Sequence, residues 1–366
     1  MNTHPDRLSQ PAEHIRKITP YQPGKPIKKL VRDMKLDPTA IIKLASNENP
    51  RGMSPQAKHA ITDAVNDGNR YPDQYDLTHA LAVHHQLPDD CIVLGNGSND
   101  VLEMIARAYL GPGCSAVMSQ YCFSVFQLAT QCAGAFSIVT PALDYGCNLA
   151  AMVGAIREDT RVLWIANPNN PTGTFICSEE LRHGLSSIPR RVLIVLDEAY
   201  IDYQSESDAY DAVRWLEEFP NLILTRSFSK IYGLAGLRIG YALCSADIAA
   251  NLHRVRQPFN ANTLALAGAQ AALRDRVFVE NSSRENRIVI RELTAGLSQL
   301  GLDWIPSYGN FVCIRSDKAE QICQHLLKEG IIVRPLAGLG MRGHIRVSVG
   351  LPQENQRFLK VLAGGL

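Results

Sequence analysis

The most informative stretch of the chain is Val192-Leu-Ile-Val-Leu-Asp-Glu-Ala-Tyr200. It begins with five apolar residues in a row, which is typical of a strand buried on both faces of a parallel sheet. The run ends at Asp197, and a carboxylate at the end of such a strand is costly to bury without a partner. We therefore expect a cation, a metal ion or a set of hydrogen-bond donors beside Asp197.

Further apolar runs flank this strand on both sides. They lie at residues 91–94, 116–118, 162–165, 222–224 and 239–243. Segments with helical period separate several of these runs, for example residues 99–110 and 178–185. Alternating strands and helices predict an α/β fold with a mainly parallel sheet, which we place in a large domain over residues 45–255.

The chain after residue 255 follows a different pattern. A helical stretch without proline covers about residues 263–300, and another helix is expected at residues 319–329. Strands are expected at residues 310–314, 331–334 and 344–349. We therefore predict a smaller α+β domain over residues 256–366. Residues 1–44 are rich in proline, glycine and lysine and are expected to form an irregular arm.

The composition is that of an ordinary globular protein. Of the 366 residues, 46% are hydrophobic and 20% are charged, so a core can form. The 37 basic and 36 acidic residues leave a net charge of +1, which argues against a nucleic-acid-binding surface built on bulk charge. Residues 108–143 carry no charge, but proline, glycine, serine and glutamine interrupt them throughout, so no membrane span is predicted.

The nine cysteines indicate a reducing compartment. Their count is odd, no two form a Cys-x-x-Cys pair, and none joins histidines at zinc-finger spacing. We interpret them as free thiols and predict no metal site. The first residues lack the apolar region of a secretory signal, so we expect a cytoplasmic protein.

Three other predicted strands also lead into polar segments, where catalytic groups of open α/β sheets gather. Residues 91–94 lead into Gly95-Asn-Gly-Ser-Asn-Asp100, which can hold an anion at a helix N-terminus, although a plain tight turn is an equal alternative. Residues 162–165 lead into Asn167-Pro-Asn-Asn-Pro-Thr-Gly173, a rigid turn with amide donors. Residues 222–224 lead into a segment that carries Lys230 and Arg238.

Together, the four strand ends offer an anion pocket, a buried carboxylate, amide donors and one lysine. A phosphate-bearing cofactor with a basic ring nitrogen and an electrophilic carbonyl would satisfy all four, and pyridoxal 5′-phosphate has these groups. A nicotinamide dehydrogenase is another class that a Gly-x-Gly turn suggests. That class fits poorly, because the third glycine of the dinucleotide fingerprint is missing and Lys230 would go unexplained.

Motifs along the whole chain indicate the same cofactor. In order, they are Tyr21-x-Pro-Gly, Leu44-Ala-Ser-Asn-Glu-Asn-Pro50, Arg70-Tyr-Pro-Asp73, Gly95-Asn-Gly-Ser98, Asn169-Asn-Pro-Thr-Gly173, Asp197-Glu-Ala-Tyr200, Ser227-Phe-Ser-Lys230, Gly233-Leu-Ala-Gly-Leu-Arg238 and Arg346. With them the chain resembles the fold-type I aminotransferases that use pyridoxal phosphate, and among these the histidinol-phosphate aminotransferase family. The resemblance implies an aspartate-aminotransferase-like fold, with a seven-stranded sheet in the large domain.

The resemblance also implies a role for each cofactor residue. Lys230 would bind the cofactor covalently and carry a proton in the reaction, and Asp197 would keep the ring nitrogen protonated. Asn170 and Tyr200 would form hydrogen bonds with the phenolic oxygen of the cofactor. The phosphate would be held by Gly97, Ser98, Asn99, Ser227, Ser229 and Arg238.

One aromatic residue should stack on the cofactor ring. The family motif Pro-Thr-Tyr is replaced here by Ser119-Gln-Tyr121, which departs from the expected pattern. The spacing to Phe126 favours Phe123 as the stacking residue, and Tyr121 is the alternative.

Other implied roles concern the substrate and a second subunit. Arg346 would bind an anionic group of the substrate, with Arg334 as a helper. Tyr21 would contact the substrate phosphate from the arm, and Asn47 would line the mouth of the site. Tyr71 would reach the cofactor phosphate of a neighbouring subunit, which predicts a homodimer with shared active sites.

The leading interpretation is transamination between L-histidinol phosphate and 2-oxoglutarate, yielding imidazole-acetol phosphate and glutamate in histidine biosynthesis. Arginines can bind both the phosphate and the carboxylates of these substrates. The alternative is an aromatic amino-acid aminotransferase, or a decarboxylase of a phosphorylated amino acid, on the same scaffold. A non-catalytic regulator on this fold usually adds a DNA-binding segment, and the arm is too short and too weakly basic for one.

Overall fold

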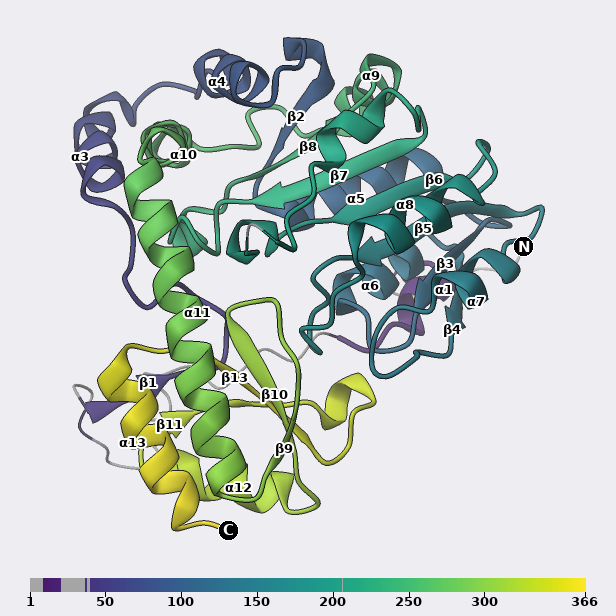
Figure 1. The fold of residues 1–366 in the computed structure, drawn as a ribbon. Helices are drawn as coiled ribbons and strands as arrows, with labels where there is room; N and C mark the ends of the chain where they lie inside the picture. The colour runs from purple at the N-terminus through teal and green to yellow at the C-terminus, as the bar shows by residue number, and fades with distance from the viewer. Residues whose placement is uncertain (1–8, 21–36, 38–39, 206) are drawn as a thin grey trace.

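The structure is a computed structural model that describes residues 9–20, 37, 40–205 and 207–366. Figure 1 shows a large sheet with helices around it and a smaller sheet below. The long helix α11 (Arg276–Gln299) runs from the larger layer to the smaller one. The predicted α/β fold with a second, smaller sheet layer is confirmed.

Among the described residues, the large sheet has seven strands in the order β2-β8-β7-β6-β5-β3-β4. Strand β8 runs antiparallel to both of its neighbours, and the other pairs are parallel. The strands are β2 (Ile92–Gly95), β3 (Ser115–Ser119), β4 (Phe136–Thr140), β5 (Thr160–Ala166), β6 (Leu193–Asp197), β7 (Leu222–Ser227) and β8 (Gly240–Cys244). The sheet is therefore mainly parallel, as predicted.

Successive residues of the central strands pack on opposite sides of this sheet. In β6, Ile194 and Leu196 join one apolar cluster, whereas Leu193 and Val195 join another. All four are buried. Because side chains alternate along a strand, burial on both faces requires the unbroken apolar run seen in the sequence.

Helices cover both clusters. The cluster with Ile194 includes residues of α3 (Pro55–Ala64), α4 (Tyr75–His85), α7 (Leu149–Gly154), α8 (Ser178–Ser186) and α10 (Thr263–Arg274). The cluster with Val195 includes residues of α5 (Ser98–Tyr109), α6 (Ser124–Cys132) and α9 (Ala246–Val255). The short helix α1 (Glu13–Arg16) lies beside α6. Over the part of the chain that the structure describes, no helix has the length and apolar character needed to cross a membrane.

The small sheet has the order β12-β13-β10-β9 and is antiparallel. Its strands are β9 (Asp303–Ile305), β10 (Phe311–Arg315), β12 (Arg334–Pro335) and β13 (His344–Ser348). Helices α11, α12 (Ala319–Lys328) and α13 (Pro352–Ala363) share an apolar cluster with it. Strand β1 (Ile42–Lys43), from the predicted arm, pairs in parallel with β11 (Ile331–Ile332).

The structure differs from the sequence-based expectations in several elements. Strand β9 has no predicted counterpart, and the strand expected over residues 331–334 is divided between β11 and β12, which belong to different sheets. No apolar run predicted β4, because this strand lies at the sheet edge, where Phe136 is 63% and Val139 50% exposed. The stretch expected as one helix over 263–300 is two helices, since Asp275 interrupts it. The Asp275 side chain accepts a hydrogen bond from the backbone N–H of Phe278 as the N-cap of α11. The domain boundaries near residues 44 and 255 stay predictions.

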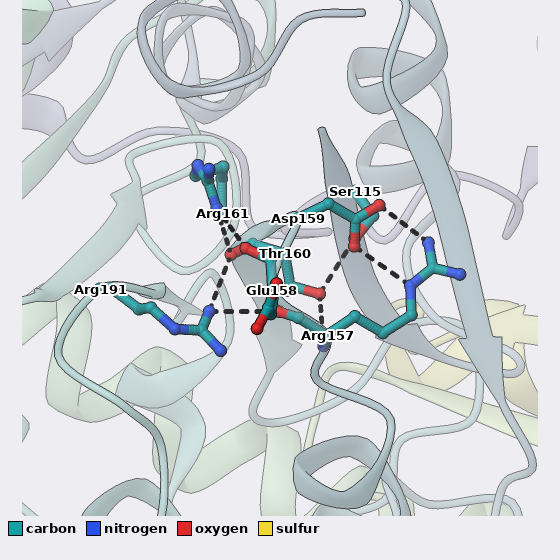
Figure 2. A network of polar contacts seen from close by, with 7 residues as sticks. All are labelled: Ser115, Arg157, Glu158, Asp159, Thr160, Arg161 and Arg191. Carbon is teal, nitrogen blue, oxygen red and sulfur yellow. Dashed lines mark hydrogen bonds and ion pairs between the residues drawn. The ribbon is translucent and has the colours of Figure 1, made fainter. Parts of the chain in front are cut away.

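A polar network joins the amino-terminal ends of β3 and β5, as Figure 2 shows. Ser115 Oγ lies 2.9 Å from Thr160 Oγ1 and donates to Asp159 Oδ1 at 3.1 Å. Arg157 Nε donates to the same Asp159 oxygen at 3.1 Å, and Arg191 donates to two backbone carbonyls beside it. Because β3 and β5 are parallel, their amino-terminal ends lie side by side. The network stabilises this end of the strands, opposite to their carboxyl ends.

Candidate active site

Asp197 ends β6 and lies between the ends of β5 and β7. It is 5% exposed, and Thr225 Oγ1, its register partner on β7, donates a hydrogen bond to Asp197 Oδ1 at 3.0 Å. Burial raises the pKa of Asp197 to about 6, against the opposing effects of the Thr225 hydroxyl, the Ala199 backbone N–H and the Lys230 charge. These contacts do not offset the burial of the charge, so a further cation beside the carboxylate would stabilise it.

Lys230 follows β7 and lines a cavity at the carboxyl edge of the large sheet. Its Nζ lies 5.4 Å from the centre of the Tyr200 ring. The cavity brings together seven residues predicted for the site: Asn47, Phe123, Asn170, Tyr200, Lys230, Arg334 and Arg346. Because their numbers run from 47 to 346, it is the fold that assembles them.

Two amide side chains reach the hydroxyl of Tyr200. Asn47 Nδ2 donates to it at 2.9 Å, and Asn170 Nδ2 at 3.3 Å. Asn47 is 1% exposed, so it belongs to the inner wall of the cavity rather than to an open mouth. The phenol of Tyr200 is therefore held from two sides.

The two arginines of the cavity stand on neighbouring strands. Arg334 of β12 and Arg346 of β13 are register partners, so their side chains lie on the same face of the small sheet. Arg346 Nη1 donates to Asn170 Oδ1 at 2.6 Å, and Nη2 donates to the carbonyl of Ala45 at 2.9 Å. Two guanidinium groups in one cavity suit an anionic ligand group.

A cup for an anion lies where β2 leads into α5. The helix begins at Ser98 after Gly97, and no side chain caps its first N–H groups. Arg238 lies directly against Gly97, because a Cβ added there would overlap Arg238 Nη2. Arg238 Nη1 also donates to Ser229 Oγ at 3.3 Å, and Ser227 Oγ accepts the Ser229 backbone N–H at 3.0 Å. A helix N-terminus, an arginine and two serines together suit a phosphate group.

Neither Tyr71 nor Asn99 lines the Lys230 cavity. Tyr71 is 80% exposed, and its ring stacks on Phe259 with the ring centres 4.4 Å apart. Asn99 lies in the first turn of α5 and lines a neighbouring hollow together with Phe123. Tyr21 falls outside the described residues.

The two candidates for the stacking aromatic line different hollows. Phe123 lines the Lys230 cavity. Tyr121 instead packs near Tyr145, with ring centres 6.1 Å apart, and lines another hollow. The placement favours Phe123.

Sequence reasoning missed Thr225 and Ser348. Thr225 contacts Asp197, and Ser348 Oγ donates to Asn47 Oδ1 at 2.9 Å. Thr225 immediately follows the apolar run 222–224, so aligning the ends of adjacent parallel strands could have found it. Ser348 lies two residues after Arg346 and therefore faces the same side of β13.

The donor set fits pyridoxal phosphate. The cup offers donors for a phosphate, Asp197 offers a buried negative charge for a protonated ring nitrogen, and Lys230 offers an amine in the cavity. The aromatic ring of Phe123 and the phenol of Tyr200 border the same space.

The seven-stranded sheet, with a lysine cavity and an anion cup at its carboxyl edge, defines an aspartate-aminotransferase-like protein of fold type I. The family model for aminotransferase class I and II matches residues 39–362. The chain is 51% identical over 357 residues to histidinol-phosphate aminotransferase 1 of Dechloromonas aromatica (strain RCB), covering 98% of this chain and 99% of that one. It is 52% identical over 351 residues to histidinol-phosphate aminotransferase of Methylobacillus flagellatus, covering 95% of each.

A solved structure has a similar fold. Histidinol-phosphate aminotransferase from Sinorhizobium meliloti, in complex with pyridoxal-5′-phosphate, superposes with a TM-score of 0.87 at 28% identity, covering 98% of this chain and 97% of that one. The chain belongs to the aminotransferases of class I and II, and within them to the histidinol-phosphate aminotransferase family. The predicted family and enzyme class are confirmed.

The raised pKa of Asp197 predicts a pH-dependent stability of the apoprotein. The neutral carboxyl is favoured by burial, so its contribution is complete below the ordinary pKa and is lost as the pH rises through about 6. Relative to Asp197→Asn, the wild-type free energy of unfolding should fall by about 2 to 3 kcal/mol between about pH 4 and pH 8. Urea unfolding of both proteins across this range measures the difference. A difference that stays constant with pH would contradict the raised pKa.

Gly97→Ala should weaken cofactor binding by about tenfold or more, because the new Cβ would displace Arg238 from the cup. Titration of the apoprotein with pyridoxal phosphate, followed by fluorescence, gives the dissociation constant. Gly113→Ala is the matched control, since Gly113 has the same φ of +84° but nothing within 4 Å of an added Cβ. Equal losses of affinity in both variants would point to backbone strain and not to the cup.

Proposed function

We propose that this protein is a pyridoxal-phosphate-dependent aminotransferase of histidine biosynthesis. It transfers the amino group of L-histidinol phosphate to 2-oxoglutarate, yielding imidazole-acetol phosphate and glutamate. The observation that carries the proposal is one cavity with Lys230, Arg334 and Arg346, in a chain 51% identical over 357 residues to a histidinol-phosphate aminotransferase.

The cofactor site is proposed as follows. When bound, pyridoxal phosphate supplies an electron-poor ring that takes up the electron pair of a broken Cα–H bond. Asp197 keeps the ring nitrogen protonated, because a buried carboxylate favours a cation beside it. Phe123 would stack on the ring, while Asn170 and Tyr200 would bind its phenolic oxygen. The phosphate is held by Gly97, Ser98, Asn99, Ser227, Ser229 and Arg238.

Lys230 is the proposed catalytic base. Its amine would hold the cofactor when the cofactor is bound, and the same amine would move the proton at the substrate Cα. The cavity holds this amine near Tyr200, with a distance of 5.4 Å from Nζ to the ring centre. The buried side chains of Tyr200 and Arg346 line the same cavity, and proton transfer over a short distance requires that the amine be held in position.

The arginine pair is proposed to select the substrates. Arg346 binds an anionic group in each half-reaction, since the phosphate of histidinol phosphate and a carboxylate of glutamate both suit a guanidinium fork. Arg334, its register partner, adds a second positive charge. Tyr21 is proposed to contact the substrate phosphate from the arm.

We also propose a homodimer with shared active sites. Tyr71 and Phe259 form an exposed aromatic pair, 80% and 52% exposed, and such surfaces usually mark an interface. In the proposed dimer, Tyr71 reaches the cofactor phosphate of the neighbouring subunit. The cytoplasm is the proposed location, because all nine cysteines are free thiols.

A panel of amino donors tests the proposed substrate. Purified protein with pyridoxal phosphate and 2-oxoglutarate is given L-histidinol phosphate, L-histidinol, L-tyrosine or L-phenylalanine, and glutamate formation is followed. The proposal expects the highest kcat/KM with L-histidinol phosphate. A higher value with an aromatic amino acid would assign the chain to the alternative aminotransferase activity.

Lys230→Ala should abolish multiple turnover while leaving the phosphate cup intact. Loss of proton transfer alone should lower kcat by about a hundredfold to ten-thousandfold. Glutamate release with histidinol phosphate measures kcat, and the absorbance spectrum shows whether the cofactor still binds non-covalently. Lys360→Ala, an exposed lysine of α13, serves as the control and should keep full activity. Near-normal turnover in Lys230→Ala would remove Lys230 from the mechanism.

Subunit mixing tests the role of Tyr71. Lys230→Ala and Tyr71→Ala homodimers should each have little activity, because every site carries one lesion. In a mixed dimer, one of the two sites carries neither lesion if Tyr71 acts across the interface, so about half of the mixed dimer's sites should recover. Activity is measured before and after exchange verified by differently tagged subunits. Unchanged activity after verified exchange would show that Tyr71 does not complete the partner's site.

A further inference from the structure

Strand β13 reaches the hydroxyl of Tyr200 along two routes. On the first, Arg346 donates to Asn170, which donates to Tyr200. On the second, Ser348 Oγ donates to Asn47 Oδ1 at 2.9 Å, and Asn47 Nδ2 donates to Tyr200 at 2.9 Å. The second route joins three buried side chains from distant parts of the chain. The predicted role of Asn47 at the substrate mouth does not account for it.

Hydrogen-bond chemistry fixes the orientation of both amides. A guanidinium has donors only, so Asn170 turns its oxygen to Arg346 and its nitrogen to Tyr200. Ser348 Oγ accepts the backbone N–H of Asn47 at 2.8 Å and therefore gives its own proton to Asn47 Oδ1. Asn47 in turn presents its nitrogen to Tyr200.

The Tyr200 oxygen accepts two N–H groups, which fills the positions where a phenol accepts hydrogen bonds. Its own proton must then point away from both amides. Tyr200 is 3% exposed, so bulk water does not take that proton, and its ring borders the cavity that Lys230 lines. The Tyr200 hydroxyl can therefore donate its proton to an acceptor that lies in the cavity.

We propose that Asn47 and Ser348 are positioning residues that direct the Tyr200 hydroxyl proton toward the phenolic oxygen of the cofactor. The inference rests on the proposed function and adds two residues to it. The backbone of Asn47 supports it, since its φ of +54° is left-handed, a conformation that asparagine adopts more readily than most residues. Asparagine at position 47 thus adopts the left-handed backbone and also supplies the amide that links Ser348 to Tyr200.

The proposal predicts a spectroscopic effect. A hydroxyl that donates to the phenolic oxygen withdraws negative charge from it, so the neighbouring lysine-bound nitrogen of the cofactor holds its proton less tightly. Without the directed proton, the pH midpoint of the cofactor absorbance change should rise. The charged groups at the site, Asp197, Lys230, Arg334 and Arg346, are the same in every variant, so the shift reports on the hydroxyl.

The test is a double-mutant cycle on the cofactor-loaded protein. Ser348→Ala and Asn47→Gly should each raise the absorbance midpoint by roughly 0.3 to 1 pH unit, and Tyr200→Phe by at least as much. Glycine is chosen at position 47 because it keeps the left-handed backbone without strain. In the Tyr200→Phe background, Ser348→Ala should cause no further shift.

Ser115→Ala is the matched control, because it also removes a buried, hydrogen-bonded serine hydroxyl, in the network of Figure 2 at the opposite edge of the sheet. It should leave the midpoint unchanged. Ser348→Thr, which keeps the hydroxyl, should restore the wild-type midpoint. An unchanged midpoint in folded Ser348→Ala, or an equal shift in the Tyr200→Phe background, would overturn the proposed role of Asn47 and Ser348. A wild-type protein that binds no pyridoxal phosphate would instead overturn the proposed function.

Discussion

Asp197 places a negative charge at the end of an apolar strand, in a position that is 5% exposed. Such a charge needs hydrogen bonds or a cation, and here the protein supplies only part of the compensation through Thr225 and Lys230. The remainder is left for a ligand with a positive ring nitrogen. The same burial that raises the pKa of Asp197 would favour binding of such a ligand, which links the core of the sheet to its chemistry.

The two sheets contribute different groups to the candidate site. The large sheet carries the lysine, the carboxylate and the anion cup at or just after the ends of its strands, while the small sheet contributes Arg334 and Arg346. Asn170 connects the groups of the two sheets, because its side chain forms hydrogen bonds with both Arg346 and Tyr200. Arg346 is thus two hydrogen bonds away from the Tyr200 phenol, which borders the Lys230 cavity.

Much of the fold and site could be predicted from the sequence, because polar residues directly after apolar runs reveal strand ends, and parallel strand ends share one edge. Seven predicted residues indeed line one cavity. The edge strand β4 was not predicted, since a half-exposed strand needs no continuous apolar run. The contact of Ser348 with Asn47 was not predictable, because a contact across 301 positions leaves no local signal. Thr225 could have been found only by aligning the ends of β6 and β7.

Arg346 and Ser348 lie two residues apart on β13, and this spacing limits the insertions and deletions that the chain can tolerate. Both side chains face the cavity wall only while β13 keeps its register against β10, in which Val347 pairs with Val312. A slip of one residue would turn both away together. The short connection that enters β13 at residues 340–343 should therefore resist single-residue insertions and deletions, whereas the exposed turn at Gly113, outside the site, should tolerate them.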